Sequence, residues 1–210
     1  MTVIPKTIHY CWFGQKDKPD IVKRCMETWH QQLTDYRMVE WNEDNFDVEV
    51  IPYVQEAYEH GKFAFVSDYA RVHALYHEGG IYLDTDVEVF QSFDPLLHHD
   101  SFWGYEQGNF IATSTIGAKP KNVLIERFLS TYERRSFLKP DGTYDSLTNV
   151  AVVTDIMKKF GFRSDGSYQE VDGVGVCYPQ PYFSPYDYIN CRNLTTDETF
   201  TLHHFHKSWL

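Results

Sequence analysis

The strongest constraint on the fold is a helix, a glycine stop, a strand and an acidic pair that follow one another without interruption. Residues 62–78 carry apolar side chains at helical spacing, and the helix is expected to end at Gly79-Gly80, a typical C-terminal stop. The short apolar strand 81–83 leads directly into Asp84-Thr85-Asp86. This order predicts an α/β fold with two carboxylates at the carboxyl end of a buried strand.

The rest of the chain alternates strand-like and helical segments in the same way, without an internal repeat or an obvious linker. The tract after Gly161 is rich in glycine, proline and tyrosine and is expected to be irregular. Further strands are expected over residues 7–13, 37–41, 87–90, 102–105, 111–117 and 200–205, and further helices from Pro19 onward and over residues 52–60, 122–134 and 149–160.

Length and charge narrow the classes of protein to which the chain can belong. Its 210 residues suffice for one sizeable domain, and its formal net charge of −11 disfavours binding to DNA or RNA. The four cysteines form no Cys-x-x-Cys pair and are expected to be reduced thiols. The first residues lack a signal-peptide pattern, and no apolar run approaches the ~20 residues of a membrane helix. We expect a cytoplasmic protein with no transmembrane segment, and peripheral contact with a membrane stays open.

The carboxylates of Asp84 and Asp86 predict a cation site. Side chains two residues apart in extended backbone point the same way, about 7 Å apart along the strand. Two oxygen ligands at a sheet edge suit Mg²⁺ or Mn²⁺, which would neutralise a diphosphate in an acidic protein. The alternative is a solvated polar strand face, since Glu88 continues the alternation. The glycine stop and the strand before the pair favour the cation site.

Asp68 and Arg71 lie one turn apart on the helix over residues 62–78. Apolar residues surround them on most sides, so we expect these charges to be buried and paired with each other or with a ligand. Arginine suits a phosphate, and aspartate suits a ribose or sugar hydroxyl. The alternative is an exposed ion pair of about 0.3 kcal/mol. Trp12, at the end of the first strand, is either a stacking partner for a nucleobase or, more ordinarily, a core residue.

The last ten residues contain further candidate ligands. His203, His204 and His206 place three imidazoles in four positions, and His204 and His206 share one face of an extended chain. They are metal ligands or surface residues. Trp209 follows closely and predicts a tail that folds back to cover part of the molecule.

Three segments carry a resemblance to a known family: residues 4–14, 65–71 and 79–86. Together they resemble the DXD-containing sugar-binding glycosyltransferases, which are related to clostridial glucosylating toxins and fungal initiating mannosyltransferases. Small bacterial members commonly serve the synthesis of capsular or other surface polysaccharides. The resemblance implies a GT-A-like single domain over residues 1–210, with a mixed, mostly parallel central sheet flanked by helices. It divides the chain into a Rossmann-like nucleotide-binding half over residues 1–90 and an acceptor half with a C-terminal lid over residues 91–210.

The resemblance also implies roles for individual residues. Asp86 is implied to be the principal metal ligand, helped by Asp84 and His204. Arg71 is implied to stabilise the departing diphosphate, so catalytic roles fall to Asp84, Asp86 and Arg71. The Ser208-Trp209 pair is implied to close over the diphosphate. Nucleotide-sugar binding is implied for Cys11, Trp12, Asp68, Arg71, Tyr82, Asp84, Thr85, Ser208 and Trp209.

On this resemblance we expect a metal-dependent, retaining glycosyltransferase with Mn²⁺ or Mg²⁺ as cofactor. It would move a hexose from a nucleotide-diphosphate sugar, with uracil as the expected base, to a saccharide acceptor, free or lipid-linked. The expected setting is cell-surface polysaccharide synthesis in the cytoplasm, and a location at the inner face of the membrane stays open. Two alternatives stay open. One is a non-catalytic nucleotide-sugar-binding module or regulatory subunit, and the other is a metal-dependent hydrolase that uses water as acceptor.

Overall fold

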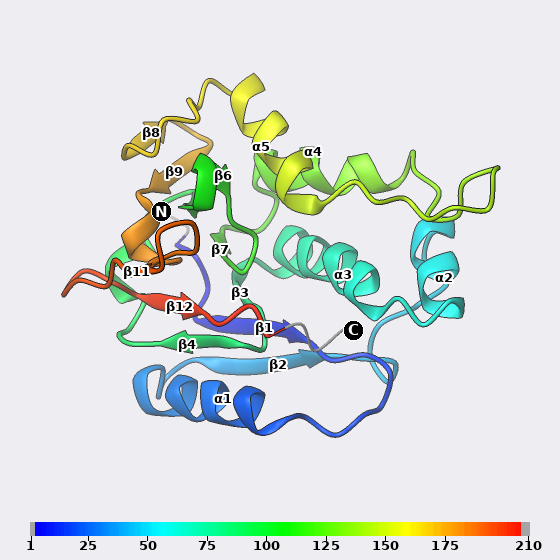
Figure 1. Ribbon diagram of the computed structural model, residues 1–210, viewed down its shortest axis with the longest axis horizontal. Coiled ribbons are helices and arrows are strands. Elements are labelled where there is room, and N and C mark those ends of the chain that lie inside the picture. The colour runs from blue at the N-terminus through cyan, green and yellow to red at the C-terminus, as the bar shows by residue number, and fades with distance from the viewer. Residues whose placement is uncertain (1–2, 207–210) are drawn as a thin grey trace.

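The computed structural model describes residues 3–206, and a mixed β-sheet forms its centre (Figure 1). The strand order is β2-β1-β3-β7-β5-β9-β8, and β6 pairs with β5 beside this path. Strands β1, β2, β3, β5 and β9 run in one direction and β7 and β8 in the other, so the prediction of a mixed, mostly parallel sheet is confirmed. The strands are β1 (Thr7–Cys11), β2 (Arg37–Trp41), β3 (Gly80–Leu83), β5 (Ser101–Glu106), β6 (Phe110–Ile111), β7 (Thr115–Ala118), β8 (Gln169–Val171) and β9 (Gly175–Tyr178).

Helices cover both faces of this sheet (Figure 1). Helix α1 packs on one face through Trp29, whose ring lies 5.4 Å from that of Tyr10 in β1. The Trp29 indole N–H also donates to the carbonyl oxygen of Val87, which lies outside this sheet, at 2.7 Å. The other helices lie on the opposite face, as the alternation of strands and helices predicted. Their bounds are α1 (Asp20–Gln32), α2 (Pro52–Glu59), α3 (Phe63–Glu78), α4 (Val123–Tyr132) and α5 (Asn149–Lys159).

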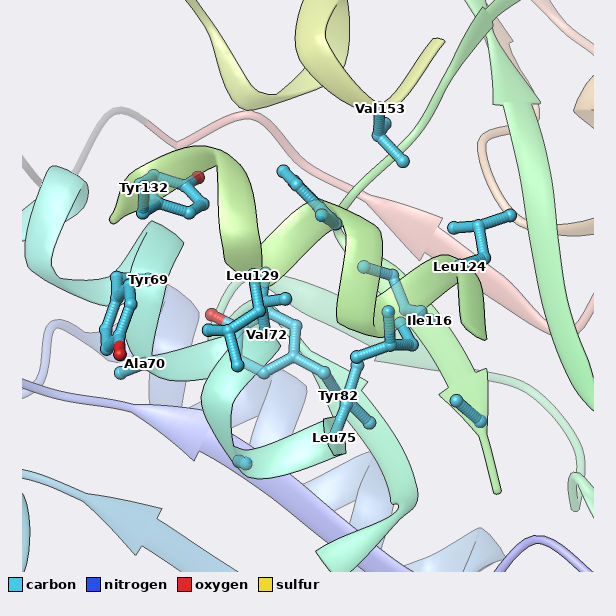
Figure 2. Packing of buried hydrophobic residues seen from close by; sticks show 14 of the residues in the cluster. Tyr69, Ala70, Val72, Leu75, Tyr82, Ile116, Leu124, Leu129, Tyr132 and Val153 are labelled. Carbon is cyan, nitrogen blue, oxygen red and sulfur yellow. The ribbon is translucent and has the colours of Figure 1, made fainter. Parts of the chain in front are cut away.

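The core between α3, α4 and the sheet holds α3 in place above β3 (Figure 2). Val72 and Leu75 of α3 pack in one fully buried cluster with Tyr82 of β3 and Ile116 of β7, and Leu129 of α4 closes it from the other side. Each large apolar side chain buried in this way contributes about 1.5–3 kcal/mol. The packing fixes the face of α3 that also carries Asp68 and Arg71.

Two glycines join α3 to β3. Gly79 and Gly80 have φ angles of 67° and 106°, in the region that favours glycine. A Cβ atom on Gly80 would lie 2.7 Å from the backbone carbonyl oxygen of Thr7. Only glycine therefore allows β3 to pair this closely with β1, and the pairing sets the position of the acidic residues that follow.

A second, small sheet brings the end of the described chain back to the acidic residues (Figure 1). Strand β12 (Thr201–His203) runs antiparallel to β4 (Val87–Val89), with His203 opposite Val87. The backbone N–H of His204 donates to the carbonyl oxygen of Asp86 at 3.1 Å. The predicted strand over residues 200–205 thus exists, and it lies beside the acidic turn.

The structure differs from the expected elements in three places. Residues 84–86 form a turn, in which the Val87 N–H donates to the carbonyl oxygen of Asp84 at 3.0 Å. The sequence had predicted that these residues continue the strand in an extended conformation. The expected strand over residues 111–117 is divided between β6, which pairs with β5, and β7, which pairs with β3. Strands β8 and β9 lie in the tract after Gly161 that was expected to be irregular. These strands are short and pair with distant segments, so the local sequence carries little signal for them.

Shorter elements complete the described chain. Strands β10 (Tyr186–Asp187) and β11 (Arg192–Asn193) form an antiparallel hairpin. Within residues 3–206, no helix combines the length and the apolar character needed to span a bilayer. The short 3-10 turns are η1 (Asp94–Leu96), η2 (Gln107–Asn109) and η3 (Gln180–Tyr182).

Candidate active site

A cavity of about 480 Å³ lies where β1 and β3 end. The carboxyl edge of an open α/β sheet is where such folds bind their ligands. Its walls come from the ends of β1, β3 and β5, from the first turns of α3, from the segment entering α5 and from the residues after β12. The residues that line the cavity include Cys11, Trp12, Asp68, Arg71, Tyr82, Asp84, Thr85, Asp86, Glu106, Thr113, Asn149, His203 and Phe205.

Asp84, Asp86 and His203 form a compact group in this cavity. One ligand atom from each lies within 4.8 Å of the other two. The turn over residues 84–86 brings the two carboxylates together, and the pairing of β12 with β4 adds the imidazole. Two carboxylates and one imidazole are a donor set that suits a divalent cation such as Mn²⁺ or Mg²⁺.

Asp86 and His203 lie within hydrogen-bonding distance and form an ion pair when the imidazole is protonated. His203 Nε2 lies 3.2 Å from Asp86 Oδ1, and the backbone N–H of His206 donates to Asp86 Oδ2 at 2.7 Å. Burial alone would raise the pKa of Asp86, but these two partners outweigh it and hold that pKa below its ordinary value. Burial would likewise lower the pKa of His203, but the neighbouring Asp86 carboxylate raises it. The Asp86 carboxylate is thus ionised and in place to bind a cation.

The structure corrects the expected histidine ligand. His204 was expected beside the metal, but its Nε2 lies 3.0 Å from Glu88 Oε2, and His203 takes the place beside Asp84 and Asp86. Successive side chains of a strand point to opposite faces, so the register of β12 on β4 turns His203 toward the cavity and His204 away. The alternation itself was predictable, but the register was not.

Arg71 connects Asp68 and Asp84 beneath the cavity. Its Nη2 lies 2.8 Å from Asp68 Oδ1 and its Nη1 lies 3.1 Å from Asp84 Oδ1. Nη1 also donates to the Thr113 carbonyl oxygen at 2.9 Å, and only 6% of the side chain is exposed. The expectation of a buried, paired guanidinium is met. Because carboxylates and a carbonyl already engage this guanidinium, it acts on the two aspartates rather than as a free phosphate ligand.

Tyr82 adds a second constraint on Asp84. Its hydroxyl donates to Asp84 Oδ1 at 2.9 Å, and its ring lies 4.5 Å from the Arg71 guanidinium carbon. Burial raises the pKa of Tyr82 well above its ordinary value, so the hydroxyl keeps its proton and remains a donor. Asp84 Oδ1 is therefore engaged, while Oδ2 lies on the side of His203, 4.0 Å from its Nε2.

Asp68 lies in a chain of polar contacts that reaches α5. Asn149 Nδ2 donates to Asp68 Oδ1 at 2.6 Å, and the Thr113 hydroxyl donates to Asn149 Oδ1 at 3.2 Å. Burial raises the pKa of Asp68 to about 6, although the Arg71 guanidinium lowers it. A hydroxyl-bearing ligand in the cavity would satisfy the remaining acceptor capacity of this buried carboxyl.

Trp12 lies at the wall of the cavity and is half-buried, so it is not the core residue of the alternative interpretation. Its indole N–H donates to the Lys16 carbonyl oxygen at 2.6 Å, and Lys18 Nζ lies 5.5 Å from its ring. Cys11, at the end of β1, is buried with its thiol 4.0 Å from the Ser67 carbonyl oxygen. These contacts fix the indole at one end of the site.

The cavity brings together the predicted residues that the structure describes, apart from His204. The predicted pair Ser208-Trp209 lies outside the described residues. One residue that the sequence analysis missed is Glu106, the last residue of β5, which also lines the cavity. The sequence offered one indication of this position, because Glu106 directly follows the predicted strand 102–105. Strands that run in the same direction as β3 have their carboxyl ends at the same edge of the sheet.

Comparisons with known proteins agree with this site. Residues 19–103 match the family described as "Glycosyltransferase sugar-binding region containing DXD motif". The matched stretch includes Asp68, Arg71, Asp84 and Asp86. Over 81 residues it is 32% identical to Glucan organizing enzyme 1 of Cryptococcus neoformans var. grubii, an overlap covering 34% of this chain and 22% of that protein.

Further similarities extend over more of the chain. Over 138 residues it is 25% identical to Inositol phosphoceramide mannosyltransferase 2 of Schizosaccharomyces pombe, covering 64% of this chain and 40% of that protein. The chain thus spans less than half the length of the curated relatives it matches. Its fold is similar to that of the PaToxG glycosyltransferase, with a TM-score of 0.55 at 17% identity over 75% of this chain and 69% of that one.

Proposed function

We propose that the chain is a metal-dependent glycosyltransferase that moves a hexose from a nucleotide-diphosphate sugar to a saccharide acceptor. The observation that carries the proposal is the group of Asp84, Asp86 and His203 in a cavity at the carboxyl edge of the sheet. The DXD sugar-binding region supports it. The proposal includes a uridine diphosphate donor, retention of the anomeric configuration, and a role in cell-surface polysaccharide synthesis in the cytoplasm.

Asp86, Asp84 and His203 fit Mn²⁺ or Mg²⁺ and would hold it. When bound, such a cation neutralises the negative charge that builds on a departing diphosphate. Asp86 is the principal anchor, since its carboxylate is ionised and fixed by His203 and the His206 N–H. Asp84 is oriented from behind by Arg71 and Tyr82, which leaves its Oδ2 toward the cavity.

The other side chains would bind and orient the donor. The indole of Trp12 offers a stacking face for the base at one end of the cavity. Asp68 and Asn149 offer paired acceptor and donor groups for sugar or ribose hydroxyls. If configuration is retained by attack from the leaving-group side, a diphosphate oxygen takes the proton of the acceptor hydroxyl. We therefore assign no protein side chain as general base.

The test is the release of nucleoside diphosphate from a panel of UDP- and GDP-hexoses, with Mn²⁺ and with EDTA. Mannose is the first hexose to examine, because one of the relatives is named a mannosyltransferase. Asp86→Ala should abolish the metal-dependent release without unfolding the protein. Glu88→Ala is the matched control, because Glu88 is a neighbouring carboxylate that contacts His204 and lies outside the metal group. Near-normal turnover by the Asp86→Ala variant would contradict the proposal.

The same assay separates the alternatives. Metal-dependent nucleotide binding without release, with or without saccharides present, would indicate a non-catalytic binding module. Release that no saccharide accelerates would indicate a hydrolase. Nuclear magnetic resonance of the transferred product, which reports its anomeric configuration, tests retention. Cell fractionation tests the proposed cytoplasmic location.

A further inference from the structure

Glu106 is a cavity carboxylate that neither the metal group nor the Arg71 contacts use. It ends β5, it is half-buried, and it lines the same cavity as Asp84 and His203. Within the described residues no side chain donates a hydrogen bond to it or pairs with it. Burial raises the pKa of Glu106 to about 7, with a further rise from Asp84 and an opposing effect of His203. A buried carboxyl of this kind lacks the donors that would offset its lost hydration.

A row of aromatic side chains begins at the metal group and leads out of the cavity. The Phe205 ring lies 3.9 Å from the His203 ring, and the Tyr188 ring lies 4.8 Å from that of Phe205. Tyr186 continues the row at 4.6 Å from Tyr188. Tyr188 and Phe205 are 43% and 38% exposed, so both rings offer a face to a ligand.

The hairpin that carries Tyr188 is attached next to Glu106. The backbone N–H of Tyr188 donates to the side-chain oxygen of Gln107, the residue after Glu106, at 3.0 Å. Burial raises the pKa of the Tyr188 hydroxyl to about 12, with smaller contributions from Tyr186, Asp86 and Glu106. Tyr188 therefore lies beside the part of the cavity wall that Glu106 and Phe205 form, because it contacts both Gln107 and Phe205.

The order of the strands separates this surface from the nucleotide end. Trp12 follows β1, Asp84 follows β3, and Glu106 ends β5, with β7 between β3 and β5. Neighbouring strands lie ~4.8 Å apart, so the backbones of β3 and β5 are separated by roughly 10 Å, and β5 lies on the side away from β1 and Trp12. The group of potential metal ligands contains Asp84, Asp86 and His203 and does not include Glu106. The separation of the strands leaves room for a group on the far side of the transferred sugar.

We infer that Glu106, Tyr188 and Phe205 form the subsite for the saccharide acceptor, an inference that rests on the proposed function. The aromatic rings would pack against the C–H face of an acceptor sugar, and Glu106 would accept hydrogen bonds from its hydroxyls. A carboxylate beside aromatic rings matches the two surfaces of a sugar, one apolar and one rich in donors.

A membrane surface is the other occupant that exposed aromatic rings suggest, and the charges disfavour it. The row starts at Asp86 and His203 and has Glu106 at its side, so its inner end is acidic. The whole chain carries a net charge of −11, which would be repelled by anionic lipid head groups. A neutral, hydroxyl-rich ligand meets no such repulsion.

Saturation-transfer nuclear magnetic resonance with a panel of methyl hexosides and disaccharides tests the inference directly. At least one saccharide should bind the wild-type protein with Mn²⁺ and a nucleoside diphosphate present. Glu106→Gln and Tyr188→Ala should each weaken that binding about tenfold or more, the effect expected from loss of one charged hydrogen bond or one stacking ring. Tyr168→Ala is the matched control, because Tyr168 is a similarly exposed tyrosine whose ring contacts Tyr178 and is not part of the row that contains Phe205 and Tyr188. Nucleotide binding should be unchanged in all three variants.

The outcomes separate this inference from the proposed function. Loss of saccharide binding in both the Glu106→Gln and the Tyr188→Ala variant supports the subsite, whether or not the protein cleaves a donor. If the protein cleaves no donor, only the transferase proposal fails. If donor cleavage proceeds, its acceleration by saccharide should fall in these variants while hydrolysis without acceptor is preserved. Equal loss of hydrolysis and transfer, saccharide binding that both variants retain, or no saccharide binding at all would overturn the subsite. Binding of neutral phosphatidylcholine vesicles through Tyr188, with no saccharide bound, would also overturn it in favour of a lipid surface.

Discussion

Replacement of Arg71 by methionine tests whether this guanidinium holds the site together. The side chain is 6% exposed and pairs with Asp68 at 2.8 Å and Asp84 at 3.1 Å, while the exposed fractions of those two carboxylates are 18% and 23%. Removing one partner of a buried ion pair leaves the other charge uncompensated and costs about 3–5 kcal/mol. For a chain of this size, that corresponds to a fall in melting temperature of about 10 °C.

A second substitution separates charge from packing. In the Arg71→Met variant the carboxylates of Asp68 and Asp84 have no guanidinium between them and repel each other. Neutralising one of these carboxylates should therefore restore part of the lost stability. The double variant Arg71→Met/Asp68→Asn should recover part of the loss, with a coupling energy of about 1–3 kcal/mol in a double-mutant cycle. If packing alone mattered, the second substitution would add its own cost and the coupling would vanish.

The pH dependence supplies an independent check on Arg71→Met. The pKa of Asp68 is already raised to about 6, and loss of the guanidinium raises it further. The folded variant then binds more protons than the unfolded chain above pH 4, so its stability falls as the pH rises. Thermal unfolding followed by circular dichroism should therefore show a larger deficit at pH 8 than at pH 5. A melting temperature within about 3 °C of wild type at both pH values would refute the argument.

Three further predictions follow from the described contacts. A Cβ atom on Gly117 would clash with Phe102 Cε1, so Gly117→Ala should lower the free energy of unfolding, measured in urea, by about 1–3 kcal/mol. Adding Phe102→Leu should restore part of that loss. Burial lowers the pKa of His73 to about 4, so the neutral ring contributes its full stability above pH 6.5 and less as the pH falls. Between pH 7 and pH 5 this group should reduce the free energy of unfolding of the wild type by up to about 2 kcal/mol. His73→Phe should abolish that part of the loss when unfolding is measured by chemical denaturation. Trp12→Ala should weaken binding of the proposed nucleotide about tenfold in a calorimetric titration while the melting temperature changes little, and unchanged affinity would exclude the indole as its stacking partner.

The part of the site that the sequence predicted is the part encoded by neighbouring residues. The helix with Asp68 and Arg71, the glycine stop, β3 and the acidic pair lie in one continuous stretch, and their order sets their placement. Burial of Arg71 followed from the apolar residues around it, because a helix that is apolar on most sides is buried. The exposure of Trp12 at the cavity wall did not follow, since a tryptophan at the end of a strand fits a core equally well.

The part that was not predicted depends on pairings between distant segments. His203 rather than His204 faces the metal group because β12 pairs with β4 in one register, and a shift by one residue would exchange the two rings. Glu106 reaches the cavity because β5 runs in the same direction as β3 with β7 between them. The turn over residues 84–86 brings its carboxylates together by a local hydrogen bond, where the sequence suggested extended alternation.

The charges of the cavity explain why a cation is central to the proposed activity. Among the described residues, Asp68, Asp84, Asp86 and Glu106 line the same space, and the guanidinium of Arg71 is already engaged by the first two. His203 is paired with Asp86, so the positive charge left for a diphosphate comes mainly from Lys16 at the wall of the cavity. A diphosphate entering this cavity alone would meet carboxylates at short range, which is unfavourable wherever water is partly excluded. A divalent cation held by Asp84, Asp86 and His203 would reverse that balance. The resemblance assigned charge stabilisation to Arg71, which stays a prediction. Because Asp68 and Asp84 already engage this guanidinium, a cation held by Asp84, Asp86 and His203 would, on the proposed function, supply further compensating charge.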